Sequence, residues 1–256
     1  MTPAELLQAF GRTRAALDGS EVTFHWTGDV HSWGPGEPYR RLFGFEGVNV
    51  ARLVPDGDGY RLLSREAAFL LDPVSREILG TWEGKPVIHV WNDPANQRLR
   101  PFPIPCAELG DQVCFSLEIP LEYPSPLPVA EFPAHSADDT YRALELFQFF
   151  APAGVLGTSA PRVESTMSWT RMSPWLPWME QGRRPGGLVY HCRGRKLGSW
   201  SEVPGRIRSH IAAHRPEFAH APESWSEPNE TSWTLFRRLA EQDEERDGRR
   251  GGDARG

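Results

Sequence analysis

The stretch VTFHWTGDV, residues 22–30, decides the fold because apolar and polar residues alternate along it. Successive side chains of a β-strand point to opposite faces of the sheet, so this alternation predicts a strand with one buried face. Phe24 and Trp26 share one face, and His25 and Asp29 share the other. A mainly β protein is therefore expected.

Eight further segments carry strand patterns between turn-forming residues. They are residues 45–53, 59–72, 77–82, 87–92, 112–121, 143–150, 162–171 and 187–193. The short distances between neighbouring segments favour antiparallel hairpins, and Asp-Gly-Asp-Gly at residues 56–59 predicts one such turn. Nine strands in one open sheet tend to curl. We therefore expect an antiparallel barrel, or a strongly bent half-barrel, that is lipocalin-like in shape.

Helices are predicted at both ends of the chain. Thr2 and Glu5 have the spacing of a capping box, which predicts a helix over residues 3–17. Residues 205–214 predict a second helix, and a third is expected to begin near residue 229 or 231.

One domain is predicted over residues 1–240. A chain of 256 residues buries enough surface to stay folded without disulfides or metal. Residues 241–256 are rich in charge and then in glycine, so we expect a disordered tail. The composition leaves a homodimer open.

The composition also limits the class of protein. With 28 Lys and Arg against 34 Asp and Glu, the net charge of −6 gives no positive field for nucleic acid. The sequence lacks both a basic-then-apolar leader and 18 consecutive apolar residues, so we expect a cytoplasmic protein without membrane contact. Aromatic residues make up 11% of the chain, which predicts a large core or an aromatic-lined cavity.

Histidines within predicted strands are the first candidates for chemistry. His25 and Asp29 share one strand face, and His89, Trp91 and Asp93 share a face of a later strand. A histidine beside a carboxylate can shuttle protons. The alternative interpretation is structural: the groups on the first strand face solvent, and the later histidine is buried with a hydrogen-bond partner.

Glu66 follows Arg65 in a predicted strand, so one of the two side chains points inward. An inward charge must be paired or must titrate abnormally. A structural salt bridge to Arg52 or Arg171 is one interpretation, and a catalytic acid is the other.

Residues 168–179 form an unusually aromatic segment that contains Trp169, Trp175, Trp178 and Met179. One interpretation is that the segment folds back and fills the end of the core. The other is a stiff aromatic lid over an apolar ligand, because ligand pockets are mostly apolar with a few placed polar groups.

Sequence motifs for common reactions are absent. The chain contains no GxSxG elbow, P-loop, GxGxxG after a strand or HExxH. His25, His89 and His191 lie on three predicted strands and could converge on a metal ion, but their spacing does not require it. We therefore expect neither a metal nor a cofactor.

Several blocks of sequence together resemble one family. The blocks are FHWTG (24–28), FGFEGVNVAR (43–52), SRE (64–66), HVWNDP (89–94), LPWM (176–179) and NETSW (229–233). They resemble the bacterial and fungal family called domain of unknown function 1838, over about residues 21–236. The resemblance implies one domain but no common activity. The connection at residues 82–85 is tighter than the family pattern implies.

We expect a cofactor-independent cyclase, isomerase or lyase that acts by acid-base or shape-driven catalysis on a small apolar metabolite, such as a polyketide or terpenoid intermediate. The predicted catalytic residues are His89 or His25 as proton carrier, with Asp29, Glu66 or Asp93 as its partner or as acid. The predicted substrate contacts are Asn49, Arg52, Arg171, Trp26, Trp91, Asn92, Trp169, Trp175, Trp178, Met179, Tyr190 and His191. A lipocalin-like carrier is the first alternative, and a hydrolase with or without metal is the second.

Overall fold

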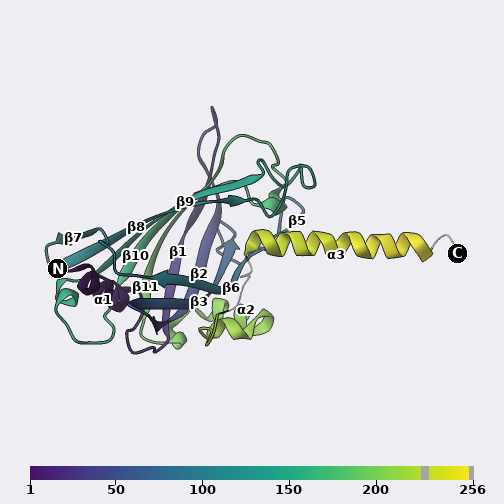
Figure 1. Ribbon diagram of the computed structural model, residues 1–256. Coiled ribbons are helices and arrows are strands. Elements are labelled where there is room, and N and C mark those ends of the chain that lie inside the picture. The colour runs from purple at the N-terminus through teal and green to yellow at the C-terminus, as the bar shows by residue number, and fades with distance from the viewer. Residues whose placement is uncertain (226–230, 254–256) are drawn as a thin grey trace.

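The computed structural model describes residues 1–225 and 231–253, which form a mainly β protein. A nine-stranded antiparallel sheet dominates it, in the order β6-β3-β2-β1-β11-β10-β9-β8-β7 (Figure 1). Its strands are β1 (Val22–Trp33), β2 (Arg40–Asp56), β3 (Gly59–Leu71), β6 (Val90–Leu99), β7 (Cys106–Leu109), β8 (Gln112–Pro124), β9 (Thr140–Pro152), β10 (Thr166–Ser173) and β11 (Gly187–Leu197). A separate hairpin joins β4 (Thr81–Trp82) to β5 (Lys85–Pro86).

The sheet is bent so that distant strands face one another. Glu66 on β3 and Glu145 on β9 line one cavity, although β2, β1, β11 and β10 lie between their strands. The ladder does not close, because no pairing in the described residues joins the end strands β6 and β7. The prediction of a mainly antiparallel β fold is confirmed, and closure into a barrel is not confirmed.

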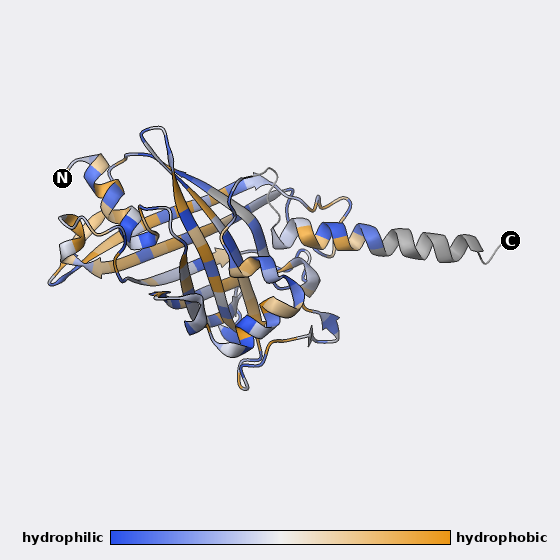
Figure 2. Cartoon of the chain, turned by 90° about the horizontal axis from the view of Figure 1, so that it is seen from below, coloured by the Kyte–Doolittle hydropathy of each residue, from blue (hydrophilic) through white to orange (hydrophobic). Residues whose placement is uncertain are grey.

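Alternating side chains divide the sheet into a concave inner face and an outer face. Figure 2 shows hydrophobic and hydrophilic residues alternating along the strands. Phe24 and Trp26 of β1 belong to the inner core, whereas Val48 of β2 and Phe69 of β3 belong to an outer cluster. Both faces are therefore covered.

Helix α1 (Pro3–Arg14) closes one end of the inner face. The predicted capping box is confirmed, because Thr2 and Glu5 each accept a hydrogen bond from the other's backbone N–H. The ring of Phe10 lies 5.8 Å from that of Phe115 and 5.7 Å from that of Phe149. This packing fixes the helix against β8 and β9.

Two further helices lie at the carboxyl end of the chain. Helix α2 (Gly205–His214) has the bounds that the sequence predicted, and it packs Ile207 and Ile211 into the outer cluster. Helix α3 (Ser232–Asp253) extends away from the sheet beyond its first turns (Figure 1), so a helix occupies residues for which the sequence predicted disorder. The short 3-10 helices are η1 (Ala153–Leu156), η2 (Pro177–Met179), η3 (Trp200–Glu202) and η4 (Pro216–Ala219).

Strand prediction failed between residues 77 and 92. Two longer strands were expected there, but the structure has the small β4-β5 hairpin and a strand β6 that begins at Val90. Gly84 in the turn has a positive φ of 79°, and Pro86 cannot donate a ladder hydrogen bond. Elsewhere the predicted hairpin at residues 56–59 is confirmed, since Asp56 pairs with Gly59.

Candidate active site

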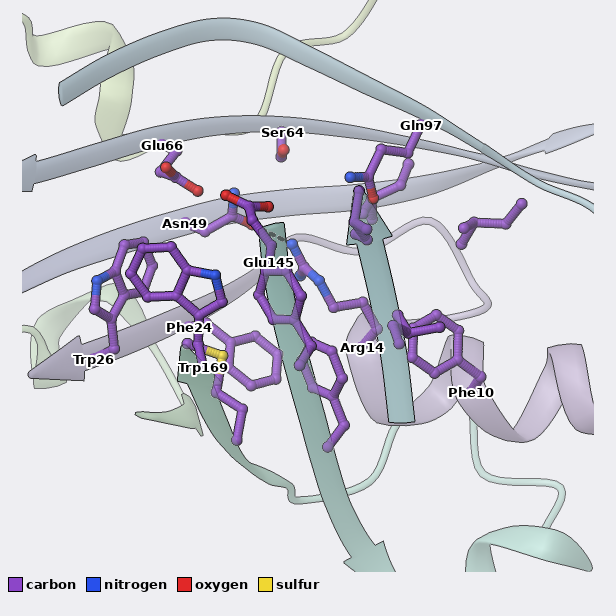
Figure 3. A pocket seen from close by; sticks show the side chains of 17 residues that line it. Phe10, Arg14, Phe24, Trp26, Asn49, Ser64, Glu66, Gln97, Glu145 and Trp169 are labelled. Carbon is purple, nitrogen blue, oxygen red and sulfur yellow. Dashed lines mark hydrogen bonds between the residues drawn. The ribbon is translucent and has the colours of Figure 1, made fainter. Parts of the chain in front are cut away.

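The concave face of the sheet holds a cavity of about 150 Å³ (Figure 3). Helix α1 and strands β1, β2, β3, β6, β8, β9 and β10 all contribute side chains to it. Its apolar lining consists of Phe10, Phe24, Trp26, Leu62, Leu99, Leu117, Ile119, Phe147, Phe149, Met167 and Trp169. Its polar lining consists of Arg14, Asn49, Ser64, Glu66, Gln97 and Glu145.

Glycine makes room for the aromatic wall. A Cβ on Gly47 would lie 2.5 Å from the ring of Trp26 and 2.7 Å from the carbonyl oxygen of Ala67. The indole of Trp169 is stacked on Phe45, with ring centroids 6.0 Å apart. The two tryptophans are thus held on the cavity wall by backbone and ring packing.

Glu66 belongs to the polar side of this cavity. It stands in register between Asn49 on β2 and Asn92 on β6, and the Asn92 amide donates a hydrogen bond of 3.1 Å to it. Burial and, to a smaller extent, the nearby Glu145 raise the pKa of Glu66 to about 7, against the opposing effects of Arg171, Arg14 and the Asn92 hydrogen bond. A carboxyl group that titrates near neutral pH therefore faces the aromatic wall.

Glu145 has a different environment across the cavity. Arg171 donates a hydrogen bond of 2.8 Å to Glu145 and a second one to the hydroxyl of Tyr141. Burial opposes the charge of Arg171, but Tyr141 and Glu145 together raise its pKa above the ordinary value. The site thus combines one ion-paired carboxylate with one carboxyl group whose hydrogen bond comes from a neutral amide.

Arg14 enters the site from the last turn of α1. Its Nη2 donates a hydrogen bond of 2.7 Å to the side-chain oxygen of Asn49 (Figure 3). Its guanidinium lies over the ring of Phe24, 5.3 Å from the centroid. Burial lowers the pKa of Arg14 to about 10, so the side chain stays charged at neutral pH.

The structure brings several predicted site residues together. Trp26, Asn49, Glu66 and Trp169 line the cavity. Asn92 and Arg171 lie behind it as hydrogen-bond donors to the two glutamates.

The histidines of the sequence hypothesis lie on the outer face of the sheet. His25 is 2.9 Å from Glu46, which also pairs with Arg206 of α2. His89 accepts a hydrogen bond from the backbone of Leu70 at 3.2 Å, and burial lowers its pKa to about 4. Neither histidine lines the cavity, so their catalytic roles stay predictions without support from its geometry.

The remaining predicted residues also lie outside the cavity lining. On the outer face, Asp29 pairs with Arg76, Arg52 with Glu21 and Asp93 with Arg65, while Trp91 packs on Phe69 and Phe218, and His191 bonds Thr170. On the inner face, Trp175, Trp178, Met179 and Tyr190 are buried in the core. Within the aromatic segment, Trp175, Trp178 and Met179 therefore pack in the core, whereas Trp169 lines the cavity.

Most lining residues were not predicted, and two of them, Arg14 and Glu145, are charged residues that each had a signal in the sequence. Arg14 follows Phe10 by four positions on the apolar side of its helix. Glu145 shares a strand face with Phe147 and Phe149, where a charge is out of pattern. A charged residue at an apolar position was the signal in both cases.

The described residues contain no group of three His, Cys, Asp or Glu side chains that could hold a metal ion. No helix among residues 1–225 and 231–253 has the length and apolar character needed to cross a membrane.

The fold and cavity define a class of protein: a bent antiparallel sheet that encloses an acidic group between aromatic walls. The chain belongs to the family described as protein of unknown function (DUF1838), whose model matches residues 19–240. The resemblance noted from separate sequence blocks is thereby confirmed. No curated protein matches the chain.

Proposed function

We propose that this protein is a cofactor-independent enzyme that binds a small, mostly apolar molecule in the cavity and moves a proton with Glu66. The observation that carries the proposal is the placement of Glu66 opposite an aromatic wall, with the neutral Asn92 amide as its donor. In this proposal the bent sheet serves as a half-barrel whose interior is the active site.

The two glutamates suit different tasks. Glu145 is bound to Arg171 and supplies a fixed negative charge, whereas Glu66 is free to exchange a proton. Pairs of carboxyl groups whose environments differ in this way are typical of acid-base catalysis. A group with a pKa near neutral pH can both accept and return a proton, as an isomerisation, cyclisation or elimination requires.

A carrier is the second candidate, and the apolar walls favour it. Six aromatic rings line the cavity, from Phe10, Phe24, Trp26, Phe147, Phe149 and Trp169. A carrier would hold the same molecule and release it unchanged, and it would not need Glu66 to titrate.

Untargeted mass spectrometry separates these functions. Metabolite extract of the host is incubated in D₂O with the wild type, with Glu66→Gln, or with Glu118→Gln, which removes an exposed glutamate on β8. We expect the wild type and Glu118→Gln to convert a metabolite or to exchange one of its protons, and Glu66→Gln to do neither.

Equal conversion by the Glu66 variant would refute the assignment of this residue. A metabolite retained unchanged, in stoichiometric amount, by all three proteins would show a carrier.

A further inference from the structure

Unpartnered N–H groups gather at the cavity. Five buried side-chain nitrogens in the described residues lack a hydrogen-bond partner, and three of them belong to cavity residues: Arg14 Nη1, Trp26 Nε1 and Trp169 Nε1. Folded proteins rarely leave a buried donor unpaired, because its desolvation is not compensated. The cavity therefore has an excess of donors that a ligand with acceptor atoms would satisfy.

Two of these donors face the same part of the cavity. The Arg14 guanidinium is held in place by its other nitrogen, Nη2, which bonds Asn49. Figure 3 shows the indole nitrogen of Trp169 on the side of its ring toward Glu145 and Arg14, while the nitrogen of Trp26 lies at the far side. A group with two oxygens between Arg14 and Trp169 would accept from both.

The charges in the site favour an anion. Arg14 forms no ion pair in the described part of the chain, and its neighbour Asn49 is neutral. Glu145 is bound to Arg171, and Glu66 holds its proton up to about pH 7. The positive charge of Arg14 is therefore not balanced below neutral pH, where Glu66 is protonated, and a buried charge without a counter-charge is costly.

The size of the cavity suits a ring-sized apolar group on the ligand. An apolar cavity of about 150 Å³ accommodates benzene, and this cavity has the same volume of about 150 Å³. Rings such as Phe24 and Phe149 on its wall favour edge-on or offset contacts with another ring.

We infer that the ligand is a carboxylate attached to one ring-sized apolar group, and that Arg14 Nη1 and Trp169 Nε1 donate hydrogen bonds to its oxygens. The inference rests on the proposed function, since it places the ligand in the same cavity. A second acceptor on the ligand, such as a carbonyl oxygen, would meet Trp26.

Binding of a carboxylate is coupled to protonation of Glu66. The ligand charge adds to the repulsion from Glu145, and Arg14 and Arg171 are the cations that face Glu66. The anion therefore binds the form in which Glu66 is protonated. The dissociation constant should rise about tenfold for each pH unit above 7 in the wild type, and Glu66→Gln should not show this slope.

Calorimetric titration with phenylacetate and its neutral analogue phenylacetamide tests the inference. At pH 6 we expect phenylacetate to bind at least about tenfold more tightly, because an ionised acceptor forms stronger hydrogen bonds with a cation. Trp169→Phe keeps a ring and removes one N–H, so it should weaken phenylacetate about tenfold. Trp178→Phe is the matched control, since it removes an equally buried, unpartnered N–H that does not line the cavity.

Equal affinity for the two probes, equal affinity of the two tryptophan variants, or no binding of phenylacetate would overturn the inference. Arg14→Gln gives an independent check, because it should abolish the preference for phenylacetate over phenylacetamide. If the metabolite experiment shows conversion that depends on Glu66, but phenylacetamide binds at least as tightly as phenylacetate, the proposed enzyme stands and its substrate is neutral. If phenylacetate binds as expected, but the metabolite experiment shows no conversion that depends on Glu66, the proposed enzyme is refuted and the carboxylate site remains.

Discussion

Replacing Glu66 by Gln should stabilise the free protein above neutral pH. Burial raises the pKa of Glu66 from the ordinary 4.5 to about 7, so the folded state binds more protons than the unfolded state between these values. The stabilising contribution of the protonated carboxyl is complete below pH 4.5 and is lost as the pH rises through 7. A shift from 4.5 to about 7 corresponds to about 3 kcal/mol.

Glutamine is a close substitute because its carbonyl oxygen can still accept from Asn92. The variant should therefore exceed the wild type by about 3 kcal/mol at pH 8 and by less than about 1 kcal/mol at pH 5. Glu118→Gln makes the same change of charge at an exposed position of β8 and should differ from the wild type by less than about 0.5 kcal/mol.

Urea unfolding at pH 5 and pH 8 measures these differences, with midpoints compared at equal slopes. A stability difference between Glu66→Gln and the wild type that is the same at both pH values would refute the reasoning, because it would mean that Glu66 titrates alike in the folded and unfolded chains.

Three further predictions concern the supports of the site. Gly47→Ala should lower the unfolding free energy by about 2 kcal/mol, measured in urea, because the added Cβ meets the Trp26 ring and backbone. Glu145→Gln should lower the unfolding free energy by about 3 kcal/mol, because the largely buried charge of Arg171 loses its carboxylate partner. An unchanged unfolding free energy would show that this ion pair does not stabilise the fold. Lys196→Met should cost about 2 kcal/mol by removing the hydrogen bonds to the carbonyls of Arg12 in α1 and of Ala15 just after it. Burial lowers the pKa of Lys196 from 10.5 to about 7, so between these pH values the unfolded chain binds more protons than the folded chain. The unfolding free energy of the wild type should therefore rise from pH 7 to 10.5, and that of the variant should not show this rise.

Local patterns predicted those elements that depend on neighbouring residues. Alternation along residues 22–30 predicted β1 and the face that carries Phe24 and Trp26. The capping box at Thr2 predicted the start of α1, which ends at Arg14 instead of residue 17 because the backbone turns out of the helix at Ala15.

The composition of the cavity was less accessible from sequence. Strand periodicity showed that one of Arg65 and Glu66 points inward, but it could not say which; the structure turns Glu66 into the cavity and pairs Arg65 with Asp93 outside. The facing of Glu66 and Glu145 depends on how far the sheet bends, and periodicity within a strand carries no information on that curvature.

The sequence did not show that His25 and His89 lie outside the cavity, for a related reason. His25 lies on β1 and His89 just before β6, on faces that the sequence suggested were available for chemistry, but α2 and its neighbours cover the outer face and bury polar groups there. Burial of a polar side chain in a strand thus did not distinguish the concave face from the helix-covered one.

The titration of Glu66 itself tests the central claim most directly. Carbon-detected NMR of the glutamate carboxyl carbons from pH 4 to pH 9, with Glu66→Gln used to assign the signal, reports this group alone. The account predicts an inflection near pH 7 for Glu66. An inflection near the ordinary value of 4.5 would contradict it, because Glu66 would then be an ordinary ionised carboxylate at neutral pH and not the near-neutral acid-base group that the account assigns to the cavity.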